Sequence, residues 1–425
     1  MAESKDPNRE SLEATRANAA LPEPPRVNRR ALLVGGTSLG LAALGCESGA
    51  SPELSAERAR AMGGAGAPAP TAVTSAVAKG GPNSSRPGGP VLELVKLGPP
   101  PWKTFDPFLF CVHHRDDYPA GNVALGPTVS LSGRNIGEDF ANKDGWNMYH
   151  GDVVPGFPRH PHRGFETVTV TRRGFVDHSD SLGATARYGE GDVQWMTAGA
   201  GIVHAEMFPL LDARGKNPAE LFQIWLNLPA KNKFAQPYFS MFWKNQVPRW
   251  SAVDDRGLTT AVTVVAGAGG NVRAPAPPPD SWASHPDASI AIWSLVMPAG
   301  ARFELPQVPA GVDRTLYVFE GDGARVGEVD VPQRTAVRLR SGVAVPIVAG
   351  PRPTELLLLQ GRPIGEPVVA HGPFVMNQRS EIEQAIRDYR RTQFGGWPWP
   401  GDGPVHTRES GRFAIHANGR KEKAT

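Results

Sequence analysis

Two short pairs of residues have the types and spacing that could perform chemistry. The first pair is His160 and His162, and the second is His204 and Glu206, with one residue between the members of each pair. In a β-strand, residues i and i+2 project from the same face, so each pair can direct two ligands to one side. Two neighbouring strands could therefore bring all four side chains together. Three imidazoles and a carboxylate suit a divalent ion such as Fe(II), Mn(II), Ni(II) or Zn(II).

The alternative reading of a single His-x-His pair is a surface or turn histidine without a ligand role. Two such pairs, each in a strand-like stretch and separated by glycine turns, favour a metal site instead. His113, His114 and His150 lie upstream of the first pair, and we expect them to make hydrogen bonds rather than to add a fifth ligand.

The strand-like pattern around these pairs recurs later in the chain, beginning near Ser289. Ungapped alignment sets Arg159–Val170 against Gln307–Val318, and Gly199 against Gly342. The positions opposite the four candidate ligands are then all apolar: Val308, Ala310, Ile347 and Ala349. We therefore predict two barrels of one fold, of which only the first binds a metal.

Four ordered segments resemble the pirin family of the cupin superfamily: HPHRGFETVTV, DHSDSLG, GDVQWMTAGAGIVHAEM and FQIWLNLPAKNK. The resemblance extends from about Val91 to Gly396. It implies an all-β fold of two cupin (double-stranded β-helix) barrels in tandem, with a short C-terminal helix. It also implies that the metal ligands are His160, His162, His204 and Glu206, and that Glu166 is not a ligand but either supports the ligands or is structural.

The same resemblance implies a quercetin 2,3-dioxygenase-like reaction of a small aromatic substrate with dioxygen. The expected cofactor is one divalent metal ion, with Fe(II) preferred and Mn, Ni, Cu or Zn as alternatives. Glu206 would be both a ligand and the catalytic base. Phe165, Trp195 and Met196 either stack on the substrate or pack in the core. The competing function is a non-enzymatic, metal-dependent sensor or protein-interaction scaffold.

The N-terminus resembles an export signal. Arg29 and Arg30 precede the uncharged apolar run Ala31–Gly45, which is too short to span a bilayer comfortably. Cys46 follows in a lipoprotein-like cleavage box. We expect export by the twin-arginine route to the periplasmic side and membrane anchoring if Cys46 is acylated. An ordinary cleaved signal or an uncleaved anchor is the alternative, with a cytoplasmic protein if the signal is not used.

The remaining composition divides the chain and limits its partners. Residues 47–90 are rich in Ala, Gly, Pro and Ser and read as a flexible tether. Lys and Arg number 45 against 42 Asp and Glu, which gives no basic stripe for nucleic acid. We expect a monomer. The predicted divisions are the signal at 1–46, the tether at 47–90, the metal-binding cupin at 91–228, the second cupin at 229–372 and the C-terminal helix and tail at 373–425.

Three smaller expectations concern local structure. The stretch from His113 to Val153 reads as an insertion, and we expect it near the mouth of the metal-binding barrel. A helix after Asn377 should begin with a capping box of Ser380 and Glu383. Residues 402–425 are polar and are predicted to lie loose.

Overall fold

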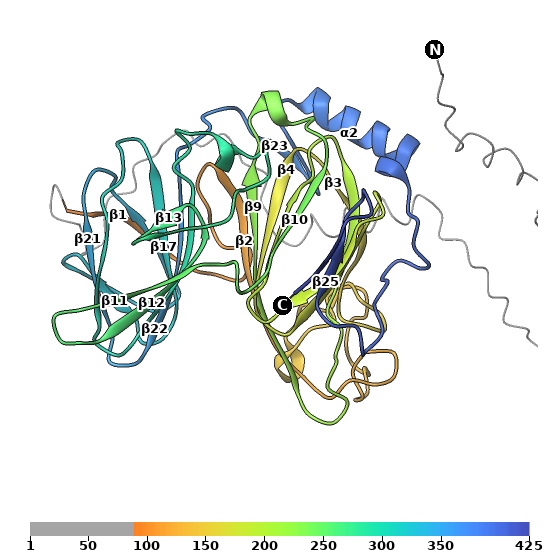
Figure 1. The fold of residues 1–425 in the computed structure, drawn as a ribbon, viewed down its shortest axis with the longest axis horizontal. Coiled ribbons are helices and arrows are strands. Elements are labelled where there is room, and N and C mark those ends of the chain that lie inside the picture. The colour runs from red at the N-terminus through yellow and green to blue at the C-terminus, as the bar shows by residue number, and fades with distance from the viewer. Residues whose placement is uncertain (1–88, 425) are drawn as a thin grey trace, which may run out of the picture. The chain divides into compact units, whose positions relative to one another are not determined.

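Residues 89–424, which a computed structural model describes, fold into two β-barrels followed by a short helix (Figure 1). The predicted fold class, two tandem cupin barrels with a C-terminal helix, is confirmed. The predicted signal and nearly all of the predicted tether lie outside the described residues. Within the described part of the chain, no helix is long and apolar enough to cross a membrane.

The N-terminal barrel consists of two antiparallel sheets. Its five-stranded sheet has the order β10 (Tyr238–Phe242), β7 (Val193–Thr197), β4 (Phe165–Arg173), β9 (Asn217–Asn227), β2 (Phe108–Tyr118). Its six-stranded sheet has the order β26 (Lys421–Lys423), β25 (Phe413–Ile415), β6 (Thr185–Gly189), β5 (Phe175–Asp180), β8 (Ile202–Met207), β3 (Gly156–His162).

The C-terminal barrel repeats this plan. Its seven-stranded sheet has the order β1 (Val91–Lys96), β20 (Thr335–Leu339), β17 (Asp313–Glu320), β22 (Thr354–Gly361), β15 (Ala291–Met297), β12 (Thr259–Ala266), β11 (Arg249–Val253). Its four-stranded sheet has the order β16 (Arg302–Leu305), β21 (Val345–Ala349), β18 (Ala324–Val326), β19 (Val329–Val331).

Short elements complete the described fold. They are the pairs β13 (Ala268–Gly269) with β14 (Val272–Arg273) and β23 (Val369–His371) with β24 (Phe374–Met376), the helix α2 (Arg379–Thr392), and the 3-10 turns η1 (Lys143–Gly145), η2 (Ala230–Asn232), η3 (Trp282–Ser284) and η4 (Gln393–Gly395).

The two barrels exchange strands across the predicted domain ranges. Strand β1 precedes the N-terminal barrel in the chain but pairs with β20 of the C-terminal barrel. Strand β10 follows β9 and pairs with β7 of the N-terminal barrel. Each exchanged strand occupies the same place in its sheet, beside β20 in one barrel and beside β7 in the other. The strand exchange therefore follows the duplication.

The ungapped alignment of the two barrels is wrong at the first histidine pair. Strand β3 pairs with β8 as β16 pairs with β21, so β16 is the counterpart of β3. Phe303 pairs with Ile347 as His160 pairs with His204. If Ile347 is the counterpart of His204, the counterparts of His160 and His162 are therefore Phe303 and Leu305. Val308 and Ala310 instead fall in the connection after β16, because residues 306–312 join β16 to β17 whereas two residues join β3 to β4. The counterparts remain apolar.

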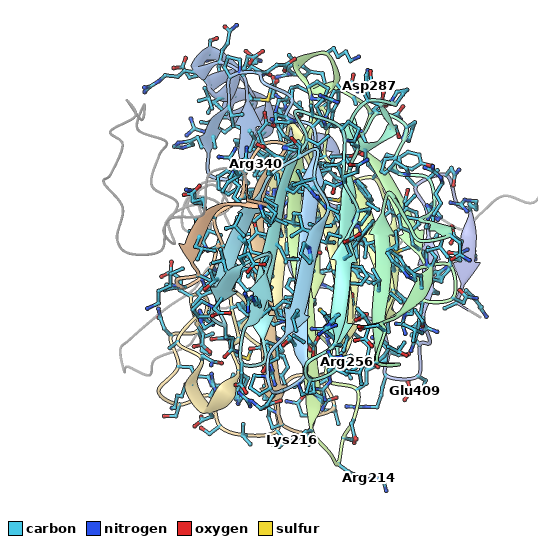
Figure 2. The ribbon with its side chains drawn as sticks, turned by 90° about the vertical axis from the view of Figure 1, so that its left-hand side faces the viewer. Arg214, Lys216, Arg256, Asp287, Arg340 and Glu409 are labelled. Atoms are coloured by element: carbon cyan, nitrogen blue, oxygen red, sulfur yellow. The ribbon has the colours of Figure 1, made fainter. Side chains whose placement is uncertain are left out.

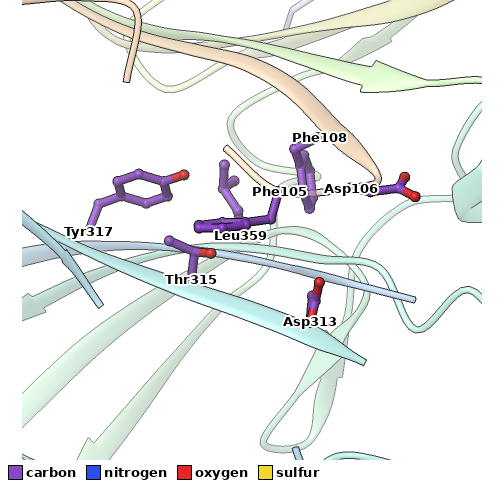
Figure 3. A pocket seen from close by; sticks show the side chains of 7 residues that line it. All are labelled: Phe105, Asp106, Phe108, Asp313, Thr315, Tyr317 and Leu359. Carbon is purple, nitrogen blue, oxygen red and sulfur yellow. The ribbon is translucent and has the colours of Figure 1, made fainter. Parts of the chain in front are cut away.

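A shared hydrophobic core holds the barrels together. Alternation along β4 sends Val168 and Val170 into this core, where Tyr317 and Ile292 of the C-terminal barrel also pack. Beside it, where the start of β2 approaches β17, lies a hollow too narrow to admit a water molecule (Figure 3). The hollow is lined by Phe105, Asp106, Phe108, Asp313, Thr315, Tyr317 and Leu359. It contains none of the candidate ligands.

The C-terminal tail is ordered, and the expectation of a loose tail is wrong. Strand β25 pairs with β6 and extends the six-stranded sheet of the N-terminal barrel. A fully buried ion pair explains the attachment, because Arg187 donates to both carboxylate oxygens of Asp177 at 2.7 Å. The same guanidinium donates to the carbonyls of His406, Thr407 and Ser410, so the tail satisfies its remaining donors.

Helix α2 begins two residues before the expected position. Its N-cap is Gln378, and the reciprocal partner is Glu381 rather than Glu383. The sequence pattern favoured Ser380 because Ser, Thr, Asp and Asn are the preferred N-cap residues, whereas glutamine is not. The apolar stripe of Ile382, Ala385 and Tyr389 packs on Val203 and Phe374.

Charged side chains of both signs project from the described surface. Figure 2 shows Arg214, Lys216, Arg256, Asp287, Arg340 and Glu409 around the side on which the seven-stranded sheet lies. This mixture agrees with the near balance of charges in the sequence.

Candidate metal centre

Three histidines converge on one face of the six-stranded sheet. Strands β3 and β8 are antiparallel neighbours, and His160 lies directly opposite His204. His162 lies two residues along β3, on the same side. The ring centroids are 4.7 Å apart for His160 and His162, 4.4 Å for His160 and His204, and 4.9 Å for His162 and His204. One nitrogen from each ring lies within 4.8 Å of the others.

Burial keeps these imidazoles in the neutral form that binds metals. All three rings are buried. Burial lowers the pKa of His160 to about 4 and places the pKa of His162 and of His204 well below the usual value. Each ring therefore presents an unprotonated nitrogen at neutral pH.

The hydrogen bonds of the cluster fit a bound cation. His160 Nδ1 lies 2.9 Å from the carbonyl oxygen of Pro158, which orients the ring and leaves Nε2 free. Neither nitrogen of His204 has a hydrogen-bond partner, nor does Nδ1 of His162, although all are buried. Buried polar atoms seldom lack partners, and a metal ion would bind one nitrogen of each ring. The donor set thus fits one divalent ion.

Glu206 lies beside the cluster but outside the group of three nitrogens. Its Oε2 is 3.9 Å from His204 Nε2 and accepts a 2.7 Å hydrogen bond from Gln223 Nε2. Its Oε1 lies 3.1 Å from Thr169 Oγ1 and 3.5 Å from the Tyr188 hydroxyl oxygen. Burial raises the pKa of Glu206. The structure therefore brings together three of the four predicted ligands, with the fourth adjacent, and its role as a ligand stays a prediction.

Aromatic side chains border His162. Trp225 lies 5.4 Å from the His162 ring and stacks on Phe110 at 4.5 Å, and both aromatics are half-buried. Phe165 is fully buried, 5.0 Å from His162 and 4.3 Å from Trp225. Sequence reasoning missed Phe110 and Trp225. The alternation of Gln223 and Trp225 along FQIWLNLP could have indicated that both face the barrel interior.

Trp195 and Met196, two of the three residues expected to stack on a substrate or to pack in the core, are fully buried. Trp195 belongs to the core between the barrels, and Met196 packs with Ala198 and Ile202. Core packing is the correct reading for both. Only Phe165 lies against a ring of the histidine cluster.

The other histidines of this region have hydrogen-bond partners and lie outside the cluster. His113 Nε2 is 2.9 Å from Glu220, His114 Nδ1 is 2.9 Å from the Tyr149 hydroxyl, and His150 Nδ1 is 2.6 Å from the Gly137 carbonyl. His178 is fully buried, and its ring lies 5.5 Å from that of His204.

The insertion lies against strand β3, which contains His160 and His162. Tyr149 bridges to Gly156 and stacks on Phe157, and the Phe157 ring is 6.5 Å from His160. Arg134 organises the insertion from within, since its guanidinium lies over the Trp146 ring and donates to Asp139 at 2.9 Å. This stretch therefore borders the histidine cluster through β3.

Glu166 belongs to the interface between the barrels. Its carboxylate accepts hydrogen bonds from Thr197 Oγ1 at 2.6 Å and from Ser281 Oγ at 2.5 Å, and it is not part of the histidine cluster. Ser281 lies in the connection from β14 to β15 of the C-terminal barrel, next to η3. The position supports the structural alternative.

Replacing Glu166 by Gln should make stability less sensitive to pH. Burial raises the pKa of Glu166 from 4.5 to about 7, so its contribution to stability is present below pH 4.5 and is lost as the pH rises through 7. The free energy of unfolding of the wild type relative to Glu166→Gln should fall by up to about 3 kcal/mol across this range. Urea unfolding of both proteins at pH 5 and pH 8 measures the difference. An equal pH dependence in the two proteins would show that Glu166 does not titrate in this window.

The fold and the histidine cluster together define a bicupin with one candidate metal centre among the described residues, in its N-terminal barrel. Residues 132–226 match the family described as Pirin, and residues 292–395 match the Pirin C-terminal cupin domain. The chain belongs to the pirin family.

Relatives and solved structures agree with this assignment. A Pseudomonas aeruginosa protein named "Putative quercetin 2,3-dioxygenase" is 40% identical over 243 residues, which are 56% of this chain and 80% of that protein. Human pirin is 35% identical over 257 residues, 59% of this chain and 81% of human pirin. The crystal structure of a quercetin 2,3-dioxygenase from Acinetobacter baumannii has a TM-score of 0.55 and 28% identity, and covers 72% of this chain and 96% of that chain.

Proposed function

We propose that this protein is an Fe(II)-dependent dioxygenase that acts on flat aromatic substrates of the flavonol type. The observation that carries the proposal is the convergence of three buried imidazoles, with unpartnered nitrogens, beside a carboxylate and a half-buried aromatic pair. The similarity to proteins named quercetin 2,3-dioxygenase supports the same reaction class.

The four predicted ligands would hold the ion and leave room for substrate. His160, His162 and His204 would bind through nitrogen, and Glu206 through Oε2, the oxygen nearer to His204. A bound Fe(II) ion would polarise a substrate hydroxyl as a Lewis acid and would supply redox chemistry toward dioxygen. Mn, Ni, Cu and Zn are the alternative metals for this ligand set.

Glu206 would accept the proton of the substrate hydroxyl. Its carboxylate lies at the cluster, and burial raises its pKa and so strengthens it as a base. Trp225 and Phe110 would bind a flat substrate by stacking, because they form a half-buried aromatic surface beside His162. A ring stacked on Trp225 would lie beside His162, one of the predicted ligands.

Oxygen-dependent turnover is the test of this proposal. Protein reconstituted with Fe(II) should consume dioxygen and quercetin together in air, and neither the metal-free protein nor the Fe(II) protein under nitrogen should consume quercetin. If protein shown to hold Fe(II) consumes no oxygen with any flavonol or catechol, the dioxygenase proposal is wrong.

A non-enzymatic scaffold is the second candidate, and the insertion favours it. Several large apolar side chains there are exposed, although such residues are normally buried. They are Val123, Val129, Ile136, Phe140 and Val153. A metal-dependent protein interaction through this surface would explain them without turnover.

We also propose that the protein is exported and anchored by lipid at Cys46. The support is the order of Arg29-Arg30, the apolar run Ala31–Gly45 and Cys46, followed by a tether low in large apolar residues. Export of a folded chain would allow the metal to be loaded before transport.

Changing Arg29 and Arg30 to Lys should retain the protein in the cytoplasm. The matched control is Arg58→Lys/Arg60→Lys, which makes the same exchange in the tether and should leave export unchanged. Cys46→Ser should abolish acylation and leave unprocessed precursor. Cell fractionation and labelling with a fatty-acid analogue measure both effects. Unchanged fractionation and labelling in all variants would contradict the proposal.

A further inference from the structure

Three side chains form a triangle of close polar contacts inside the N-terminal barrel. Gln223 Nε2 donates to Glu206 Oε2 at 2.7 Å, and Thr169 Oγ1 donates to Gln223 Oε1 at 2.8 Å. Glu206 Oε1 lies 3.1 Å from the same Thr169 oxygen, whose single proton is directed to Gln223. Thr169 and Glu206 are buried and Gln223 is half-buried, so these bonds are largely shielded from water.

The triangle connects the two sheets of the barrel. Thr169 in β4 and Gln223 in β9 are direct neighbours across the five-stranded sheet. Glu206 comes from β8 of the six-stranded sheet. Because Val168 and Val170 face the core between the barrels, Thr169 faces the opposite side, which is the interior of the barrel. The carboxylate is therefore held from the sheet that faces it.

The direction of the Gln223 amide follows from its partners. An ionised carboxylate only accepts hydrogen bonds, so the NH2 group of Gln223 must face Glu206. Its carbonyl oxygen then faces Thr169, whose hydroxyl donates. Glutamine is suited to this position because it offers a donor to the carboxylate and an acceptor to the hydroxyl.

We propose that Gln223, supported by Thr169, is a positioning residue that holds the Glu206 carboxylate in the orientation that completes the metal site. This inference rests on the proposed metal centre. Glu206 Oε2, the oxygen bound by Gln223, is also the oxygen 3.9 Å from His204 Nε2. Without the amide, the carboxylate is free to adopt other rotamers, and metal binding must then order it.

The chain provides a matched control in Gln194. Thr169 is flanked by Gln194 in β7 and by Gln223 in β9, at the same level of the sheet. Gln194 accepts a hydrogen bond from the Tyr188 hydroxyl but makes no bond to Glu206. Leucine at either position removes an amide of the same size from the same layer of the barrel.

Titration of metal-free protein with Co(II) tests the inference. Gln223→Leu should weaken Co(II) binding by about 10–100-fold, the usual loss when a group that orients a ligand is removed. Its visible absorption spectrum should also change, because the carboxylate ligand is displaced. Gln194→Leu should match the wild type in both affinity and spectrum.

The possible outcomes separate this inference from the metal centre itself. If the wild type binds no Co(II), the metal centre and the positioning role are both wrong. If the wild type binds Co(II) and Gln223→Leu binds equally well with the same spectrum, only the positioning role is wrong. Equal weakening by Gln194→Leu would assign the loss to general disturbance of the barrel and would overturn the inference.

A second variant protects the test against misfolding of Gln223→Leu. Thr169→Val has the same shape but cannot donate to Gln223 Oε1, and it should weaken Co(II) binding in the same direction by a smaller factor. Thermal unfolding of the metal-free variants serves as the structural readout. Lower melting temperatures with unchanged Co(II) affinity would show a merely structural role and would overturn the proposal.

Discussion

Replacing His160 and His162 together by Ala should abolish metal binding. The double variant removes two of the three imidazoles whose nitrogens converge within 4.8 Å and leaves only His204 and Glu206. Two ligands cannot supply the coordination that a divalent ion requires in a protein. Elemental analysis of purified protein should find one ion per chain in the wild type and only background in the double variant.

A control with the same number of histidines removed makes the result specific. His285→Ala/His371→Ala changes two residues outside the described cluster and should retain one ion per chain. Two ions per wild-type chain would contradict the prediction that the second barrel lacks ligands. Retention of metal by His160→Ala/His162→Ala would exclude this cluster as the site.

Glu206→Gln should retain metal at reduced affinity while turnover falls by about 10²–10⁴-fold, the usual effect of removing a general base. The amide keeps the size of the side chain and one oxygen, which can still accept from Gln223 Nε2. It removes the negative charge and the capacity to accept the substrate proton. Oxygen consumption with quercetin should be measured on protein whose Fe(II) content is determined in the same sample.

Glu206→Asp is the control for this experiment, because it keeps the charge but shortens the reach. It should recover part of the turnover that Glu206→Gln loses. Full activity of Glu206→Gln at equal Fe(II) content would exclude Glu206 as the base. Loss of all metal would assign the residue to binding alone.

The strand pattern was predictable from the sequence because it depends on residues close together in the chain. The duplication was predictable because the same pattern recurs later in the chain. The period of two along a strand indicates that His160 and His162 share a face, and likewise His204 and Glu206. The recurrence of short strands after Ser289 indicates two barrels. The convergence of the three histidines is consistent with this reasoning, and the fold class is confirmed.

Such patterns could not predict that the two barrels exchange strands β1 and β10. They also could not predict that the C-terminal tail is ordered. Nothing in Val91–Lys96 indicates that it pairs with β20 rather than with a strand of the nearer barrel. Residues 402–425 are polar, yet they attach to the N-terminal barrel because the buried Arg187 needs acceptors that the tail carbonyls provide. Polarity of a segment does not exclude order when its backbone completes a buried hydrogen-bond set.

By itself, therefore, the sequence determined the identity of the candidate ligands and the presence of two barrels with one histidine set. Only the tertiary structure decided that Trp225 and Phe110 border His162, that Trp195 faces away, and that Gln223 binds Glu206. The physical reason is that spacing along a strand defines which side a residue faces. The partner it meets there depends on the register between strands and on the packing of one sheet against the other.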